Sequence, residues 1–274
     1  MKQNIKVTAI AGPTACGKTA YAVELAKKVN GEVVSADSRL VYKGFDIGTS
    51  KPSVEEMCGI KHHLIDIVEP EENFSAGLYE RHARAAIADI AARGKTPIVA
   101  GGTGLYLKVL LQDWNLPEFE PDYRFREELG KLSSLQLHDK LRELDENSAL
   151  EIEPADRKKL IRRIEIVMNT GVDKALKPPE FEVEWIMLNL PRGDLYDRIN
   201  RRVDLMLENG LVEETAGLLK KHGRIKNIIE TIGYKEITAY LDGQTTLEQA
   251  AEKLKQNTRN YAKRQLTWFK KYHG

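Results

Sequence analysis

The sequence is short of cysteine, of long apolar runs and of net charge, and each shortage excludes a class of protein. Two cysteines, Cys16 and Cys58, are too few for a disulfide framework or a cysteine metal cluster. No apolar run approaches the length that crosses a bilayer, and residues 1–4 lead into a strand-like run without a signal peptide. Since the net charge is only +1, any affinity for nucleic acid must come from local basic patches. We therefore expect a cytoplasmic protein with no membrane partner.

The pattern of apolar residues predicts the fold class. At 274 residues and 42% hydrophobic content, the chain can fill the cores of one large domain and a smaller one. Strand-like runs alternate with helical patterns such as 75–93 and 194–221, which is typical of an α/β protein with a parallel sheet flanked by helices. The predicted strands are Lys6–Ala11, Glu32–Ala36, His63–Val68, Thr96–Ala100 and Trp185–Leu190.

The stretch 115–182 separates the last two predicted strands and is far longer than one crossover needs. It opens with the Pro-bearing segment 116–121, closes with the linker-like segment 177–180, and carries helical patterns between them. We interpret it as an inserted all-helical domain between the two parts of a core, 1–114 and 183–274. The helical patterns cover Arg126–Leu132, Leu135–Leu144 and Asp156–Asn169.

Residues 12–19 read GPTACGKT and lie between the first predicted strand and a helical pattern. In that context the motif predicts a phosphate-binding loop (P-loop), whose backbone N–H groups wrap a diphosphate at a helix N-terminus. Lys18 would add a mobile positive charge, and the Thr19 hydroxyl would ligate Mg²⁺. An ordinary glycine-bearing turn is the alternative. The predicted diphosphate-binding residues are Gly12, Pro13, Thr14, Ala15, Cys16, Gly17, Lys18 and Thr19.

Two polar residues follow predicted strands at the edge of the sheet where such folds bind ligands. Asp37 follows the second strand, and its carboxylate can reach a reacting centre near the P-loop; a helix or turn cap is the alternative. Thr103 follows the fourth strand in the segment 101–106, where its hydroxyl could bond a diphosphate or bridging oxygen; a simple turn hydroxyl is the alternative.

Two basic segments are candidates for RNA contact. Lys158 and Arg162 are spaced i,i+4 along a predicted helix, as are Lys159 and Arg163. The C-terminal segment 251–274 holds seven Lys or Arg against one Glu, interleaved with aromatic residues, a mixture that suits phosphate contact and base stacking. A solvated helix face is the alternative for either segment alone.

Five motifs follow one another along the chain, and the second is close to diagnostic. Their order and spacings resemble those of the tRNA dimethylallyltransferases over nearly the whole chain. The resemblance implies a P-loop NTPase-like fold and prenylation of N6 of the adenosine just 3′ of the anticodon in tRNA, with dimethylallyl diphosphate as donor and diphosphate as product. The motifs are Gly12–Thr19, Asp37–Pro52, Gly101–Tyr106, Ile232–Glu236 and Lys263–Phe269.

This implied reaction assigns roles to residues. Adenine N6 is a poor nucleophile, so a base must accept its proton, and Asp37 is the candidate. The departing diphosphate needs electrostatic stabilisation from the P-loop with Mg²⁺, from Thr103 and from an arginine. Arg202 occupies the position that contacts diphosphate in the family, and Arg201 adjoins it. The catalytic candidates are therefore Asp37, Thr103 and Arg202.

The resemblance also implies contacts with tRNA, including the inserted domain as a tRNA-binding unit. The target base must be extruded from the anticodon loop, where Ser38 and Arg39 would meet it and Leu40 would line its slot. Most relatives carry a Met-Gln or similar pair at positions 39 and 40. Arg162 and the segment 232–236 match tRNA-contacting positions of the family. The candidates are Asp37, Ser38, Arg39, Leu40, Thr103, Lys158, Lys159, Arg162, Gly233, Tyr234 and Lys235.

Three other functions share parts of this pattern. A nucleotide or small-molecule kinase would share the P-loop but would need an arginine-rich lid, which the sequence does not show. A prenyltransferase acting on free adenine nucleotides would share the catalytic core, although the inserted domain and basic C-terminus favour tRNA. A non-enzymatic P-loop RNA-binding module would not need Asp37. We expect a monomer.

Overall fold

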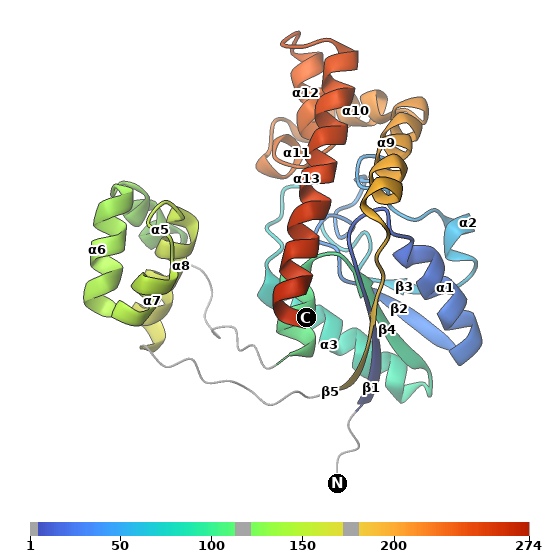
Figure 1. Cartoon of the computed structure of the whole chain (residues 1–274), viewed down its shortest axis with the longest axis horizontal. Helices are drawn as coiled ribbons and strands as arrows, with labels where there is room; N and C mark the ends of the chain where they lie inside the picture. Colours follow the sequence, from blue (N-terminus) through green and yellow to red (C-terminus); the bar gives the residue numbers. More distant parts are fainter. Residues whose placement is uncertain (1–4, 113–121, 172–180, 274) are drawn as a thin grey trace. The chain divides into compact units, whose positions relative to one another are not determined.

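The computed structural model describes residues 5–112, 122–171 and 181–273. It divides into two compact units, one formed by Met1–Gln112 with Pro178–Gly274 and the other by Asp113–Lys177. Figure 1 shows the first unit as a sheet with surrounding helices and the second as a small group of helices. The α/β class with an inserted helical unit is thereby confirmed. Among the described residues, no helix is both long enough and apolar enough to cross a bilayer.

The first unit is built on a five-stranded parallel sheet with the order β3-β2-β4-β1-β5. Ala11 in β1 lies opposite Gly101 in β4, and Ser35 in β2 lies opposite Ala100. The loops that follow these three strands therefore open at one edge of the sheet. The strands are β1 (Ile5–Ala11), β2 (Gly31–Ser35), β3 (His62–His63), β4 (Thr96–Gly101) and β5 (Phe181–Met187).

Two strands differ from the sequence prediction. The run expected to extend from His63 to Val68 is a strand only at its first residue, because Leu64 and Asp66 have positive φ angles of 65° and 56°. Val68 forms only an isolated bridge with Tyr42. The last strand begins at Phe181, four residues before the predicted Trp185, and ends at Met187.

Helices α1 (Lys18–Val29) and α3 (Ala76–Ala92) pack against β2 and β4. Ala22 and Ala26 of α1 bury against Ile10, Val33 and Ile98 of the sheet, so the small residues allow the helix to approach closely. The remaining helices before the inserted unit are the short α2 (Val54–Met57) and α4 (Gly104–Leu111).

The predicted helix 194–221 is two helices, because Gly210 adopts φ 97° between them. A left-handed conformation ends an α-helix and is accessible to glycine without a steric cost. The C-terminal helices are α9 (Arg192–Glu208), α10 (Leu211–His222), α11 (Lys226–Ile229), α12 (Tyr234–Leu241) and α13 (Leu247–His273).

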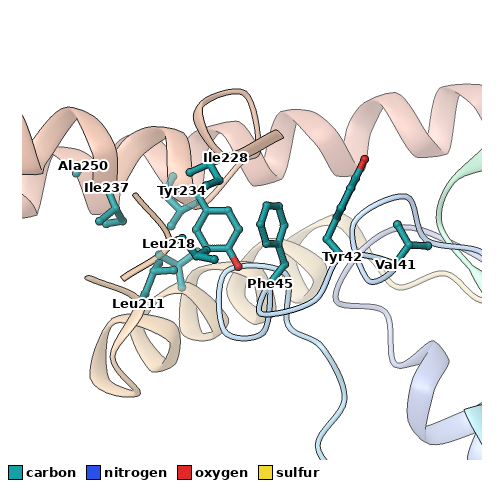
Figure 2. Close-up of a cluster of buried hydrophobic side chains, with 11 residues drawn as sticks. Val41, Tyr42, Phe45, Leu211, Leu218, Ile228, Tyr234, Ile237 and Ala250 are labelled. Atoms are coloured by element: carbon teal, nitrogen blue, oxygen red, sulfur yellow. The ribbon is translucent and has the colours of Figure 1, made fainter. Parts of the chain in front are cut away.

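A second apolar cluster joins these helices to the loop after β2. Phe45 and Tyr234 are both fully buried at its centre, with ring centroids 4.8 Å apart in an edge-to-face arrangement. Figure 2 shows the two rings next to each other, near the aliphatic side chains Leu211, Leu218, Ile228 and Ile237. This cluster fixes the segment that begins at Asp37 against the C-terminal helices.

The second unit has its own core, in which Leu137 and Leu141 meet Leu160 and Ile164. Its predicted helices are present, and a short additional helix starts at Asp145, whose carboxylate accepts the Ser148 N–H as an N-cap. The segments 116–121 and 177–180 of the sequence prediction fall outside the described residues. The helices are α5 (Tyr123–Gly130), α6 (Ser134–Leu144), α7 (Glu146–Glu151) and α8 (Arg157–Thr170).

Candidate functional site

The P-loop connects β1 to α1, as the sequence predicted. Ala15 and Gly17 have φ angles of 64° and 93°, and such turns aim successive backbone N–H groups into a concavity that fits an anion. The Lys18 ammonium donates to the Pro13 carbonyl at 2.7 Å, so it lies over the loop. Burial lowers the pKa of Lys18, while the thiol of Cys16 and the carboxylate of Asp37 act in the opposite direction. An anionic ligand in the loop would compensate this desolvated charge.

Close packing on both sides holds the loop in place. A Cβ atom on Gly12 would lie 2.3 Å from the Leu188 carbonyl oxygen, so only glycine fits there. Ala15 and Cys16 are buried against Leu195 and Ile199 of α9. The P-loop is therefore clamped between the sheet and α9.

Asp37 and Thr103 lie side by side at the edge of the sheet. Ser38, the residue after Asp37, is hydrogen-bonded to Thr103 although 65 positions separate them in the sequence. The Thr103 hydroxyl oxygen accepts the Ser38 N–H at 3.1 Å, and the Thr103 N–H donates to the Ala36 carbonyl at 3.1 Å. One carboxylate oxygen of Asp37 accepts the Arg39 N–H at 2.8 Å. In the described part of the chain the second oxygen has no hydrogen-bond partner, so it is available to take a proton. Asp37, Ser38, Arg39 and Leu40 are all half-buried.

Tyr261 of α13 belongs to this group. Burial, assisted by the negative charge of Asp37, raises the pKa of its phenol to about 12, and an interaction with the Thr103 side chain opposes the shift. The Arg264 guanidinium lies 5.7 Å from the Tyr261 ring centroid. Sequence reasoning placed Tyr261 only in a basic, aromatic C-terminal segment; no motif indicated that it would lie beside Asp37 and Thr103.

Arg202, on α9, lies close enough to the P-loop to interact electrostatically with Cys16 and Lys18. Burial lowers the pKa of its guanidinium, and the electrostatic influence of Glu56 and Cys16 opposes that shift. Since Cys16 is a P-loop residue, the positive charge of Arg202 would attract a diphosphate bound in the loop.

The three residues of the segment 233–235 lie in different environments. Tyr234 is fully buried in the apolar cluster (Figure 2). Its hydroxyl donates to the Glu214 carboxylate at 2.7 Å. Gly233 has φ 105°, and a Cβ there would lie 2.9 Å from the Gly48 carbonyl oxygen. Lys235 is exposed. The predicted RNA contact through the Tyr234 side chain therefore does not fit this structure, because the ring fills the core beside Phe45, whereas Lys235 presents a cation to solvent.

The basic side chains of helix α8 also lie in two different environments. Lys158 and Lys159 are exposed, and Lys159 pairs with Asp156 at 2.6 Å. Arg162 pairs with the fully buried Glu165. Arg163 is buried, and its guanidinium donates to Asp145 at 2.9 Å. The two arginines thus brace the helical unit, whereas Lys158 and Lys159 present their charges to solvent.

The residues present fit a Mg²⁺ ion that draws most of its ligands from a diphosphate. Thr19 is exposed at the start of α1, so its hydroxyl can ligate a cation. Within 5–112, 122–171 and 181–273, no group of three His, Cys, Asp or Glu residues could hold a metal by itself. One hydroxyl plus diphosphate oxygens and water is a common Mg²⁺ shell, and the protein-only sites that Ca²⁺ prefers are richer in carboxylate.

Comparisons with known proteins agree with this arrangement. The family model for IPP transferase matches residues 40–272. The tRNA dimethylallyltransferase of Caldanaerobacter subterraneus subsp. tengcongensis is 47% identical, covering 98% of this chain and 90% of its own. The crystal structure of the full-length tRNA isopentenylpyrophosphate transferase from Bacillus halodurans matches with a TM-score of 0.74 and 45% identity, over 97% of this chain and 86% of its own. The crystal structure of a eukaryotic dimethylallyltransferase acting on tRNA matches with a TM-score of 0.84 and 32% identity, covering 97% of this chain and 70% of its own.

Proposed function

The chain belongs to the tRNA dimethylallyltransferase family, and on that premise we propose that it transfers the dimethylallyl group of dimethylallyl diphosphate to N6 of the adenosine just 3′ of the anticodon in tRNA. The observation that carries the proposal is the juxtaposition of a P-loop with Asp37 and Thr103 at one edge of the sheet. Phosphate binding and a carboxylate base are the two elements that such a transfer needs.

The chemistry follows from this geometry. The bond from N6 to the allylic C1 forms as the C1–O bond breaks, and the bonding pair leaves with the diphosphate. The free carboxylate oxygen of Asp37 accepts the N6 proton. The Thr103 hydroxyl, whose oxygen accepts the Ser38 N–H, would bond the bridging oxygen of the donor. The P-loop amides, Lys18 and Arg202 stabilise the charge that the departing diphosphate gains.

Mg²⁺ would be held by Thr19 together with the diphosphate oxygens, and it would supply further positive charge to the leaving group. Because anticodon-loop bases are stacked, the target adenine must be extruded into the site, where Ser38, Arg39 and Leu40 would meet it. Lys158, Lys159 and Lys235 would contact the tRNA backbone. The proposal includes a monomeric, cytoplasmic enzyme; light scattering in solution tests the oligomeric state.

The decisive experiment incubates the protein with unmodified tRNA and either dimethylallyl diphosphate labelled in the prenyl group or ATP labelled in its γ-phosphate. Prenyl label in tRNA supports the proposal; phosphate label would favour a kinase. Prenyl label in free AMP, ADP or ATP, but not in tRNA, would identify a free-nucleotide prenyltransferase.

Asp37→Asn provides the test at residue level, because the amide keeps the oxygen that accepts the Arg39 N–H but cannot take a proton. Loss of a general base lowers the rate by a factor of about 10² to 10⁴. We expect single-turnover transfer to fall by that amount, with affinities for donor and tRNA retained. Asp139→Asn, at an exposed position of α6, is the matched control. Near-normal turnover by Asp37→Asn would rule out the assigned base.

A further inference from the structure

The helix that covers the P-loop carries two arginines on the same side. Leu195 and Ile199 of α9 are fully buried, and both pack on the P-loop. Arg198 and Arg202 flank this contact four residues apart, a spacing that stacks side chains one turn above each other on a helix. Arg202 is already part of the proposed site; Arg198 has not been assigned a role.

Arg198 reaches the P-loop itself. A Cβ atom built on Gly17 would lie 3.8 Å from Nη1 of Arg198. Gly17 immediately precedes Lys18, whose ammonium group lies over the loop. The guanidinium of Arg198 also affects the electrostatics of Arg202, so the two cations are neighbours. Arg198 and Arg202 thus both lie beside the loop.

Neither guanidinium forms an ion pair with a carboxylate of the described residues. Within the described residues, no carboxylate lies within ion-pair distance of Arg198 or Arg202, and neither makes a side-chain hydrogen bond. Other arginines of the chain behave differently: Arg93 pairs with Glu32 at 2.5 Å and Arg126 with Glu165 at 2.7 Å. Two like charges one helical turn apart repel each other, so their arrangement costs stability unless an anion lies near both.

We propose that Arg198 is a second guanidinium ligand of the donor's diphosphate, acting together with Lys18 and Arg202. This inference rests on the proposed function. Charge-assisted hydrogen bonds from a guanidinium to phosphate oxygens strengthen as the negative charge of the phosphate grows. The C1–O bond pair moves onto the diphosphate during transfer, and Arg198 keeps its own protons throughout. Arg198 therefore contributes more to the rate of transfer than to the affinity for intact donor.

The test compares Arg198→Met with Arg201→Met. Arg201, like Arg198, is exposed on α9, so its variant controls for loss of one charge from the same helix. Binding of inorganic diphosphate with Mg²⁺ is measured by titration calorimetry. We expect Arg198→Met to weaken diphosphate binding at least tenfold and Arg201→Met to change it less than twofold. Affinity for tRNA should stay within twofold in Arg198→Met.

Kinetics and stability give independent readings. In Arg198→Met the single-turnover rate should fall by a larger factor than the KM for dimethylallyl diphosphate rises. The midpoint of thermal unfolding should stay the same or increase, because repulsion from Arg202 is removed. Arg198→Gln, which keeps a polar side chain, should repeat the result. Diphosphate affinity within twofold of wild type in both variants would overturn the inference.

Lys18→Met separates this inference from the proposed function. If Lys18→Met abolishes diphosphate binding while the Arg198 variants retain it, the P-loop is the donor site and only the role of Arg198 fails. If Lys18→Met leaves diphosphate affinity unchanged, the P-loop is not the donor site and the proposed function fails as well.

Discussion

The side-chain oxygen of Gln265 accepts a hydrogen bond from the Thr14 N–H at 2.8 Å, across 251 residues of sequence. The amide nitrogen of Gln265 donates to the Gly102 carbonyl at 2.9 Å. One buried side chain of α13 thus joins the P-loop to the turn that carries Thr103. A Cβ atom on Gly102 would lie 2.3 Å from the Gln265 amide nitrogen, so the glycine is needed for this approach.

Replacing Gln265 should therefore affect both stability and donor binding. Gln265→Leu leaves the Thr14 N–H and the Gly102 carbonyl without their partner in a buried site, and each unsatisfied group costs about 1–3 kcal/mol. We expect the free energy of unfolding in urea to fall by about 2 kcal/mol or more and the KM for dimethylallyl diphosphate to rise.

The control is Gln256→Leu, the same substitution at an exposed position of the same helix. It should change neither the unfolding free energy nor the KM. Equal stability and KM for Gln265→Leu and wild type would show that the bridge does not hold the two loops.

Sequence reasoning predicted the sheet and the edge at which Asp37 and Thr103 meet, because the carboxyl ends of parallel strands share an edge and the motifs mark those ends. It could not predict partners from α13, since Gln265 and Tyr261 contact residues more than 150 positions away and no local pattern encodes such pairs. It also missed the positive φ at Leu64, where neither glycine nor asparagine signals a break. The burial of Tyr234 depends on Phe45 and Glu214, which lie on other segments.

The lysines at the start of α8 should contribute to RNA binding without stabilising the fold. The positive charges of Lys158 and Lys159 at the helix N-terminus oppose the helix dipole, and this cost offsets the small gain from the exposed Lys159–Asp156 ion pair. Replacing both by Gln should leave the thermal midpoint unchanged or slightly higher. Each phosphate contact that is lost should reduce the log–log salt slope of tRNA binding by about 0.7 to 0.9.

Filter binding at several salt concentrations measures that slope. The control is Arg124→Gln with Lys131→Gln, two exposed cations of the same unit. It should leave the slope unchanged. An equal change of the slope by both pairs of substitutions would mean that tRNA binding depends on the net charge of the unit. No change by either pair would mean that the lysines of α8 only face solvent and do not contact tRNA.

Tyr234 should contribute to stability but not to tRNA binding, and Lys235 should contribute to tRNA binding but not to stability. Tyr234→Phe keeps the ring in the core but removes the hydrogen bond to Glu214, so it should lower the free energy of unfolding by about 0.5–1.5 kcal/mol and leave tRNA affinity within twofold. Lys235→Gln should weaken tRNA binding without changing stability. Unfolding in urea and filter binding measure the two properties. Weaker tRNA binding by a fully stable Tyr234→Phe would restore Tyr234 as an RNA contact.

Glu32 should make stability depend on pH in the acid range. The carboxylate, 2% exposed, is bonded by Arg93 at 2.5 and 2.6 Å, by Lys95 at 2.7 Å and by the His63 ring at 2.7 Å. The hydrogen bonds from Arg93 hold the pKa of Glu32 well below its ordinary value, with Lys95 and His63 assisting and burial opposing. Removing one partner of a buried ion pair typically costs about 3–5 kcal/mol.

The sign of the effect follows from proton uptake. Above about pH 4.3, the ordinary Glu value, the side chain is charged in both folded and unfolded chains and its contribution is complete. As the pH falls below that value the unfolded chain takes up the proton first, so the contribution is lost progressively toward the lower pKa of the folded state. The difference in unfolding free energy between wild type and Glu32→Gln should therefore be smaller at pH 3.5 than at pH 5.5. Urea unfolding at both pH values measures it, with Glu184→Gln, an exposed glutamate of β5, as the control that shows little difference at either. A Glu32→Gln difference that stays constant between these two pH values would contradict the lowered pKa.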